Sequence, residues 1–140
     1  MSKVAVVYWS GTGNTEAMAM AVAEGAKGKG AEVSVITSAE FSPEQVSEYS
    51  AIAFGCPSMG SEQLEESEFE PMFTACEGRL SGKNIALFGS YGWGDGEWMR
   101  SWESRCNDDG ANLACDSVIC NETPDDDALA ACRELGASLA

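Results

Sequence analysis

Apolar residues occur along this chain in short runs with little polar alternation, separated by longer, more polar segments. Such runs, rich in Val, Ile, Ala and Phe, are typical of strands that are covered on both faces. Five runs are expected as strands: Val4–Trp9, Glu32–Thr37, Ala51–Gly55, Asn84–Gly89 and Ser117–Asn121. The segments between and after them are expected as helices: Thr15–Gly28, Phe69–Glu77, Glu97–Asp109 and Asp125–Leu139.

This alternation of strands and helices predicts an α/β fold. A mostly parallel sheet with helices on both faces follows from it, because parallel strands need crossover connections. Such a sheet places ligands at the carboxyl ends of its strands. The chain has 140 residues, which is the size of one domain, so residues 1–140 are expected to fold as a single unit.

The charge balance narrows the possible partners. Asp and Glu number 23 and Lys and Arg 8, which gives a net charge of −15. This argues against nucleic acid and anionic membrane surfaces, and leaves basic protein surfaces or simple solubility as the reason for the charge. No apolar run approaches the roughly 20 residues of a membrane span, and the amino terminus predicts a strand rather than a signal peptide. A cytoplasmic protein is expected.

The cysteines and the absence of histidine argue against a metal site and against hydrolytic chemistry. None of the six cysteines falls in C-x-x-C spacing, and there is no histidine, so neither a zinc nor an iron–sulfur site is expected. Nucleophiles activated by histidine are excluded as well. Most of the cysteines lie at apolar or helical positions, where small buried thiols are common, and we expect them to be reduced and structural.

A loop rich in glycine and hydroxyl groups follows the first strand: Ser10-Gly11-Thr12-Gly13-Asn14-Thr15. A strand that turns through two glycines into a helix leaves backbone N–H groups that can bind phosphate, and the side chains of this loop add further donors. The loop is not a nucleotide-hydrolysing P-loop, because Asn14 stands where that motif needs Lys, and Glu16 occupies the third glycine position of the dinucleotide motif. The alternative is an ordinary tight turn with a helix cap.

Two more unusual loops follow the third and fourth expected strands: Cys56-Pro57-Ser58-Met59-Gly60-Ser61-Glu62 and Ser90-Tyr91-Gly92-Trp93-Gly94-Asp95-Gly96. In the later loop, glycines let the backbone approach a ligand while Tyr91 and Trp93 stay exposed at the rim as a stacking surface. In the earlier loop, Met59 offers polarizable packing, and Glu62 a carboxylate that can accept a ring N–H. Taken alone, the earlier loop is equally a plain turn, and Trp93 equally a core residue.

Together the three loops resemble those of the flavodoxins, specifically the short-chain type of anaerobic bacteria, and the resemblance runs from Val4 to Leu135. It rests on the segments Tyr8–Glu16, Gly55–Glu62, Leu87–Met99 and Asn121–Asp125. The last of these lacks the long insertion of long-chain members. The resemblance implies a flavodoxin-like three-layer sandwich, with a five-stranded parallel sheet in the order 2-1-3-4-5 and helices on both faces.

The resemblance also implies a non-covalent FMN and assigns roles to loop residues. The FMN phosphate would be held by Ser10, Thr12, Asn14 and Thr15, with Ser90 as a weaker candidate. Trp93 would cover the outer face of the flavin and Met59 the inner face, while Glu62 would accept from flavin N3–H. Backbone N–H groups near Gly92 and Gly94 would face O2 and N1, and the Gly60–Ser61 turn would respond to reduction at N5. The other positions of the expected site are Gly11, Gly13, Pro57, Ser58, Tyr91 and Asp95.

The implied function is that of a low-potential one-electron carrier whose FMN cycles between semiquinone and hydroquinone and which has no substrate of its own. Two alternatives remain open at this point. One is an FMN-dependent oxidoreductase that acts on a quinone or another small molecule, and the other is a specialised flavodoxin that activates a single enzyme. The expected partners are redox proteins with basic docking surfaces, and a monomer is expected.

A crowded group of carboxylates adjoins the presumed flavin edge: Glu62, Glu65, Glu66, Glu68 and Glu70, together with Asp95. No basic residue lies among the five glutamates. They form either a docking patch that attracts basic partners or an ordinary solvated surface.

Overall fold

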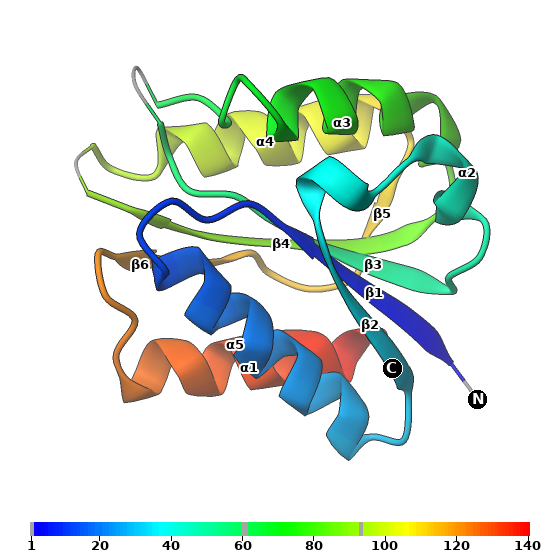
Figure 1. Ribbon diagram of the computed structural model, residues 1–140, viewed down its shortest axis with the longest axis horizontal. Coiled ribbons are helices and arrows are strands. Elements are labelled where there is room, and N and C mark those ends of the chain that lie inside the picture. Colours follow the sequence, from blue (N-terminus) through cyan, green and yellow to red (C-terminus); the bar gives the residue numbers. More distant parts are fainter. Residues whose placement is uncertain (1, 60–61, 93) are drawn as a thin grey trace.

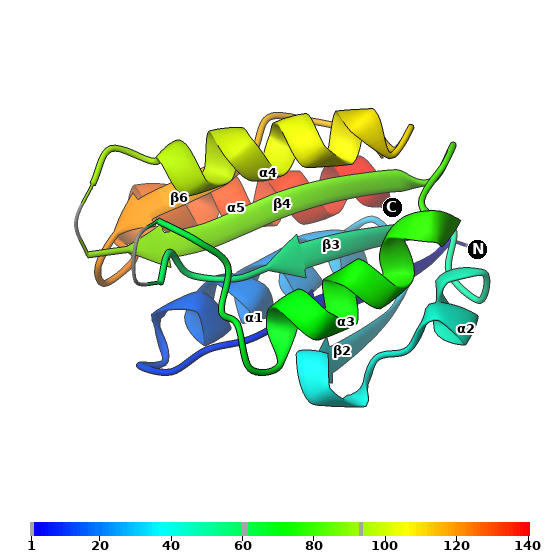
Figure 2. The ribbon, with the colours of Figure 1, turned by 90° about the horizontal axis from the view of Figure 1, so that it is seen from above.

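The computed structural model describes residues 2–59, 62–92 and 94–140, and it consists of a parallel sheet between two layers of helices (Figures 1 and 2). The strands are β1 (Lys3–Tyr8), β2 (Glu32–Thr37), β3 (Ala51–Gly55), β4 (Asn84–Tyr91), β5 (Asn112–Leu113) and β6 (Val118–Asn121). The order is β2-β1-β3-β4-β5, with β6 also paired to β4, and every pairing is parallel. The predicted strand order is therefore confirmed.

The fifth position of the sheet differs from the expectation, because two short strands share it. Leu113 of β5 pairs with Ile85, whereas Val118 of β6 pairs with Phe88. Two residues of β4 thus lie opposite the four residues 114–117. Ala114 still donates to the carbonyl of Ile85 at 2.9 Å, and the chain bulges after it, between β5 and β6. The sequence analysis missed β5, because its two residues include a single apolar side chain and give no strand pattern.

The helices cover both faces, as predicted. α1 (Asn14–Gly28) and α5 (Asp126–Leu139) lie side by side on one face, and α3 (Phe69–Cys76) and α4 (Glu97–Asp108) lie on the other (Figures 1 and 2). The short α2 (Pro43–Val46) and two 3-10 turns, Ser38–Glu40 and Glu77–Arg79, were not predicted. α2 begins with a capping box between Ser42 and Gln45. None of the helices in the described part of the chain is long and apolar enough to cross a membrane.

The two faces of the sheet are packed differently. Under α3 and α4 the core is aromatic: Phe54 meets Phe73 edge to face at 5.1 Å between ring centroids, and Phe73 meets Trp102 in the same way at 5.7 Å. Under α1 and α5 the buried helical residues are mostly small, and the two helix backbones touch. A Cβ added to Gly25 would collide with the carbonyl of Arg133, and one added to Gly136 would collide with that of Val22.

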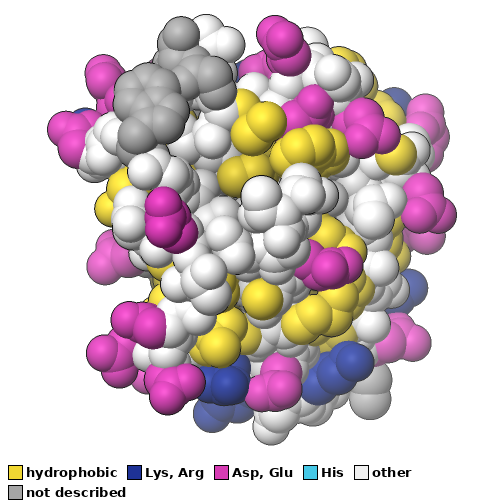
Figure 3. Space-filling model, turned by 60° about the vertical axis from the view of Figure 1, so that its left-hand side comes forward, with side chains coloured by type: hydrophobic (Ala, Val, Ile, Leu, Met, Phe, Trp, Pro, Cys, Tyr) yellow, Lys and Arg dark blue, Asp and Glu magenta, His cyan; other side chains and the backbone are white. Residues whose placement is uncertain are grey.

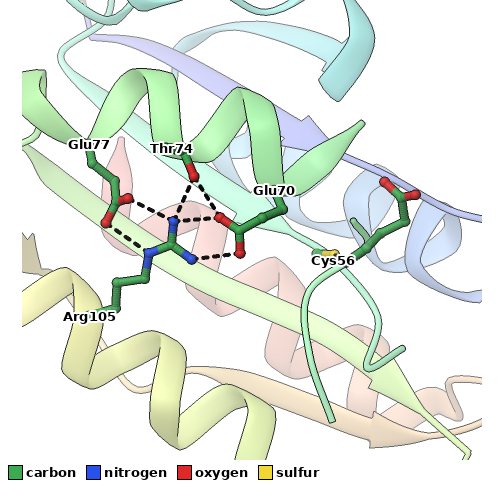
Figure 4. Close-up of polar contacts among 6 residues, drawn as sticks. Cys56, Glu70, Thr74, Glu77 and Arg105 are labelled. Atoms are coloured by element: carbon green, nitrogen blue, oxygen red, sulfur yellow. Dashed lines mark hydrogen bonds and ion pairs between the residues drawn. The ribbon is translucent and has the colours of Figure 1, made fainter. Parts of the chain in front are cut away.

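An ion-pair cluster joins α3 to α4 (Figure 4). The guanidinium of Arg105 on α4 donates to Glu70 on α3 at 2.6 and 2.8 Å and to Glu77 at 2.7 and 2.8 Å. It also lies 4.9 Å from the centroid of the Phe73 ring. Hydrogen bonds from Arg105 hold the pKa values of Glu70 and Glu77 below their ordinary values. The cluster fastens the two helices together on the side of the sheet opposite α1 and α5.

All six cysteines are thiols, which agrees with the expectation of reduced, structural residues. Four of them are fully buried: Cys56, Cys76, Cys106 and Cys132. Burial raises the pKa of the Cys132 thiol to about 12 and that of Cys106 to about 12. Such thiols stay protonated and unreactive at neutral pH, so they act as small packing groups.

Candidate functional site

The loop after β1 leads directly into α1 at the carboxyl edge of the sheet. Gly13 has a φ of 96°, a left-handed conformation that glycine adopts without strain, and its N–H donates to Ser10 Oγ at 3.0 Å. α1 starts at the next residue without a side-chain cap, so its first N–H groups stay available to a ligand. No Lys or Arg lies between Lys3 and Lys27. The loop therefore offers backbone N–H and hydroxyl donors, and no positive charge, to a bound anion.

A buried hydrogen bond joins the start of α1 to the end of β4. Thr15 Oγ1 and Ser90 Oγ lie 2.9 Å apart, and the two residues are 1% and 5% exposed. Since each hydroxyl has one proton and only one is used between the pair, the other proton remains free to donate to a ligand. The pair thus brings Ser90 to the same end of the sheet as the first loop.

A cavity of about 470 Å³ lies between the three loops that the sequence analysis singled out. Its lining includes Gly11, Thr12 and Asn14 from the first loop, Pro57, Ser58 and Met59 from the second, and Ser90, Tyr91 and Gly92 from the third. The lining is completed by Trp9, Glu122 and Thr123. Figure 3 turns this end of the molecule toward the viewer and shows acidic side chains spread over it, with basic ones mainly at the lower border.

Trp9 supports the first loop, a role that the sequence analysis did not assign. Its indole lies under Gly11, where an added Cβ would stand 3.0 Å from Trp9 Cη2. The indole Nε1 donates to Glu68 Oε1 at 2.9 Å, which ties the loop after β1 to the segment before α3. The sequence feature that could have indicated this supporting role is a tryptophan directly after a buried strand and next to a glycine-rich loop.

Glu122 and Thr123, in the turn after β6, were also missed as lining residues. The N–H of Glu122 donates to the carbonyl of Tyr91 at 2.7 Å, and Glu122 has a left-handed φ of 57°. This bond joins the turn after β6 to the end of β4. The segment Asn121–Asp125 was noted as part of the resemblance, but nothing in its composition points to a ligand.

The second loop folds back on itself. Met59 and Gln63 exchange backbone hydrogen bonds of 2.8 and 2.9 Å and form an isolated antiparallel bridge, and Ser58 N donates to the carbonyl of Ser90 at 2.9 Å. The Met59 side chain is 37% exposed beside the cavity. Gly60 and Ser61, for which a redox-linked role was expected, lie outside the described residues.

Glu62, directly before Gln63 in this loop, carries a carboxylate with one unsatisfied oxygen among the described residues. Its Oε1 is buried and has no hydrogen-bond partner among the described residues. A buried carboxylate oxygen needs a donor, and a ligand N–H could supply one, although Glu62 is not among the residues that line the cavity. The carboxylate lies against Gly94, whose φ is 86°, and a Cβ on Gly94 would collide with it.

The third loop differs partly from the expectation. The Tyr91 ring is half-buried against Trp98, with 5.5 Å between the ring centroids, instead of standing free at the rim. The reason is strand alternation, because Tyr91 is the last residue of β4 and its side chain packs into the core beneath α4. Tyr91 still lines the cavity. Asp95 is exposed and pairs with Arg100 at 3.0 Å, and Trp93, for which a stacking role was expected, lies outside the described residues.

Comparison with known proteins assigns this architecture to a family. The family model described as flavodoxin matches residues 6–136. The chain is 46% identical to the flavodoxin of Megasphaera elsdenii over 98% of both chains, and 44% identical to that of Clostridium beijerinckii over 96% of this chain and 97% of the other. The chain belongs to the flavodoxin family. The solution structure of two-electron reduced M. elsdenii flavodoxin superposes with a TM-score of 0.90 and covers 97% of each chain.

Flavodoxins carry electrons on bound FMN and are not enzymes in their own right, and this flavodoxin is an FMN-binding electron carrier. The site fits that cofactor on two grounds. The first loop offers N–H and hydroxyl donors to a phosphate, and the buried, unpartnered Glu62 Oε1 offers an acceptor to a ring N–H. When bound there, FMN would supply the group that takes up and gives off electrons.

The crowded carboxylates of this flavodoxin do not form one patch, and three of them have structural partners. Glu65 is buried and accepts the N–H groups of Ser67, Glu68 and Phe69 at 2.8, 2.7 and 2.9 Å, so it caps the start of α3. Burial opposes its ionisation, but these donors outweigh that effect and lower its pKa. Glu68 accepts a hydrogen bond from the Trp9 indole, and Glu70 forms an ion pair with Arg105.

We expect replacement of Gly94 by alanine to weaken FMN binding about tenfold. The left-handed φ strains any residue with a Cβ, and the Cβ would also displace the Glu62 carboxylate, which together cost about 1.4 kcal/mol. Quenching of FMN fluorescence by the apoprotein measures the dissociation constant. Gly82→Ala is the control, because Gly82 has a similar φ of 75° with nothing near the added Cβ. Equal constants for the two variants would contradict the assigned contact.

Proposed function

We propose that this flavodoxin is a low-potential carrier that passes single electrons between redox enzymes in the cytoplasm, as a monomer. FMN would lie in the cavity between the three loops. Its phosphate would be bound by Ser10, Thr12, Asn14 and Thr15, with the remaining hydroxyl proton of the Thr15–Ser90 pair as a further donor. Glu62 would accept from the ring N3–H and Met59 would pack on the inner face.

The observation that carries this proposal is the absence of any cation among the described residues that line the cavity. A phosphate held by neutral groups keeps its charge, and the Glu62 carboxylate adds another. Electron uptake that leaves a negative charge on the ring is then disfavoured, because like charges repel. One charge at about 10 Å and an effective dielectric of about 20 costs about 1.7 kcal/mol, or about 70 mV. The site is therefore suited to a low reduction potential.

The partners we propose are redox proteins with basic docking surfaces. With a net charge of −15, the protein attracts a basic partner over distances comparable to the Debye length. The rate of electron transfer to such a partner is expected to fall as the salt concentration rises.

The test is reconstitution with FMN followed by an anaerobic potentiometric titration. A carrier of this kind gives a yellow protein, two separate one-electron steps, and a second step shifted well below that of free FMN. It also gives no turnover of quinones with NAD(P)H unless a reductase is added. A single two-electron step would overturn the proposal, and turnover without a reductase would favour the alternative of an FMN-dependent oxidoreductase.

A further inference from the structure

The first loop, residues 10–15, separates two hollows. On one side lies the cofactor cavity, and on the other a hollow of about 430 Å³ whose lining includes Gly13 and part of the 3-10 turn after β2. Trp9 and Gly11 line both hollows. A loop with space on both sides is not held in place by core packing, so the position of its backbone depends on a few specific contacts.

The indole of Trp9 is the side chain that supports this loop. An added Cβ on Gly11 would stand 3.0 Å from Trp9 Cη2 and 3.2 Å from Cζ3, so the six-membered ring lies against the Gly11 backbone. On the other side of the indole, Nε1 donates to Glu68 Oε1 at 2.9 Å. Among the described residues, no other side-chain hydrogen bond joins residues 9–14 to a different segment of the chain. The bond to Glu68 therefore fixes the ring on which the loop rests.

Glu68 is itself fixed from the core side. Its N–H donates to Glu65 Oε1 at 2.7 Å, and Glu65 is buried and also accepts the N–H groups of Ser67 and Phe69. The Glu68 side chain is exposed, and no Lys or Arg of the described residues forms an ion pair with it. The carboxylate thus has the Trp9 indole as its hydrogen-bond partner, and a continuous set of contacts runs from the buried Glu65 to the first loop.

We propose that Glu68 is a positioning residue for the phosphate of the cofactor, which acts through Trp9 on the backbone of the first loop. Glu68 does not line the cofactor cavity, so it does not act by contact with the flavin. The phosphate donors of this loop are backbone N–H groups and short side chains, and a displacement of the backbone would weaken several hydrogen bonds at once. The inference rests on the proposed function, which places the FMN phosphate in this loop and the flavin ring at the other two.

The experiment compares FMN with riboflavin, which has the same ring system and no phosphate. Dissociation constants of the apoprotein are measured by quenching of flavin fluorescence. Glu68→Met removes the acceptor of the indole N–H, whereas Glu68→Gln loses the same charge but keeps an oxygen that accepts it. We expect Glu68→Met to bind FMN about fivefold more weakly than Glu68→Gln, and the two variants to bind riboflavin equally. Because Glu68 is exposed, both variants should fold, which far-UV circular dichroism checks.

The same two substitutions in a Trp9→Phe background test whether Glu68 acts through the indole. Phenylalanine has no N–H to donate, so Glu68→Met and Glu68→Gln should then bind FMN equally. A fivefold difference that persisted without the indole would contradict the assigned route.

Equal FMN binding by Glu68→Met and Glu68→Gln in the presence of Trp9 would overturn the inference. An equal loss of affinity for FMN and riboflavin would overturn it as well, because it would indicate a general structural effect. Failure of the proposed function has a different signature, since the unaltered protein would then bind riboflavin as tightly as FMN or bind neither flavin.

Discussion

Replacement of Gly136 by alanine is expected to lower the free energy of unfolding by about 3 kcal/mol. Gly136 lies where α5 meets α1, and an added methyl group would overlap the carbonyl of Val22. The clash is between two helix backbones, so no side-chain rotation relieves it and the helices must separate. Urea denaturation of the FMN-free protein, followed by far-UV circular dichroism, measures the change. Gly25→Ala, at the other close contact of the same two helices, should behave alike.

Gly28→Ala provides the matched control for this contact. Gly28 ends α1, nothing lies near its added Cβ, and its φ is not left-handed. Alanine favours the helix and restricts the unfolded chain, so this change should be neutral or stabilising by up to about 1 kcal/mol. If Gly136→Ala were as stable as Gly28→Ala, the close packing of α1 on α5 would be refuted.

Replacement of Arg105 by methionine is expected to cost about 2 kcal/mol at pH 7. Methionine keeps much of the packing volume, but it leaves the carboxylates of Glu70 and Glu77, which are 37% and 21% exposed, without their cation. Removing one partner of a partly buried ion pair is costly because the other charge stays behind. Partial exposure to water keeps the cost below that of a fully buried pair.

The cost of Arg105→Met should depend on pH in a defined direction. The arginine lowers the pKa values of both glutamates in the folded protein, so its stabilising effect is complete above the ordinary glutamate pKa. The effect is lost as the pH falls through the lowered values. Denaturation of the two proteins across the acid range should therefore show their stabilities converging.

Arg100→Met is the comparison variant for the Arg105 cluster. The Arg100–Asp95 pair is exposed, with 59% and 79% of the two side chains accessible, and should change stability by less than about 0.5 kcal/mol at any pH. If Arg105→Met lowered the free energy of unfolding no more than Arg100→Met, the cluster of Figure 4 would contribute little to stability.

Sequence patterns were sufficient for the elements that are buried along their length. β3, whose five residues are all buried, and β4, buried over most of its length, gave continuous apolar runs, and the long helices were predicted to within two residues at their ends. The two-residue β5 and the four-residue α2 were missed. The short β5 depends on its pairing with β4, which is distant in the chain and which local composition does not encode. For α2 the Ser42–Gln45 capping box was a local signal that was overlooked.

The three loops that line the cavity could be singled out from glycine, hydroxyl and aromatic residues at the strand ends, because those residue types have special backbone or donor properties; that they bind the cofactor stays a prediction. The acidic residues could not be interpreted in the same way. Glu65 caps a helix because three backbone N–H groups face its carboxylate in the folded chain. Glu70 binds Arg105, which lies 35 positions away in the chain. Sequence shows the charge of such residues but not which group faces it.

The bulge between β5 and β6 gives this fold a place where the chain length can change. After Ala114, whose N–H still donates to the carbonyl of Ile85, residues 115–117 bulge away from β4, and β5 and β6 are each held in register by their own pairing with β4. Extra residues inserted there would lengthen an existing loop, and the entropic cost of closing a loop grows only slowly with its length. A tag or a small binding module grafted at this point should leave the three cofactor loops undisturbed.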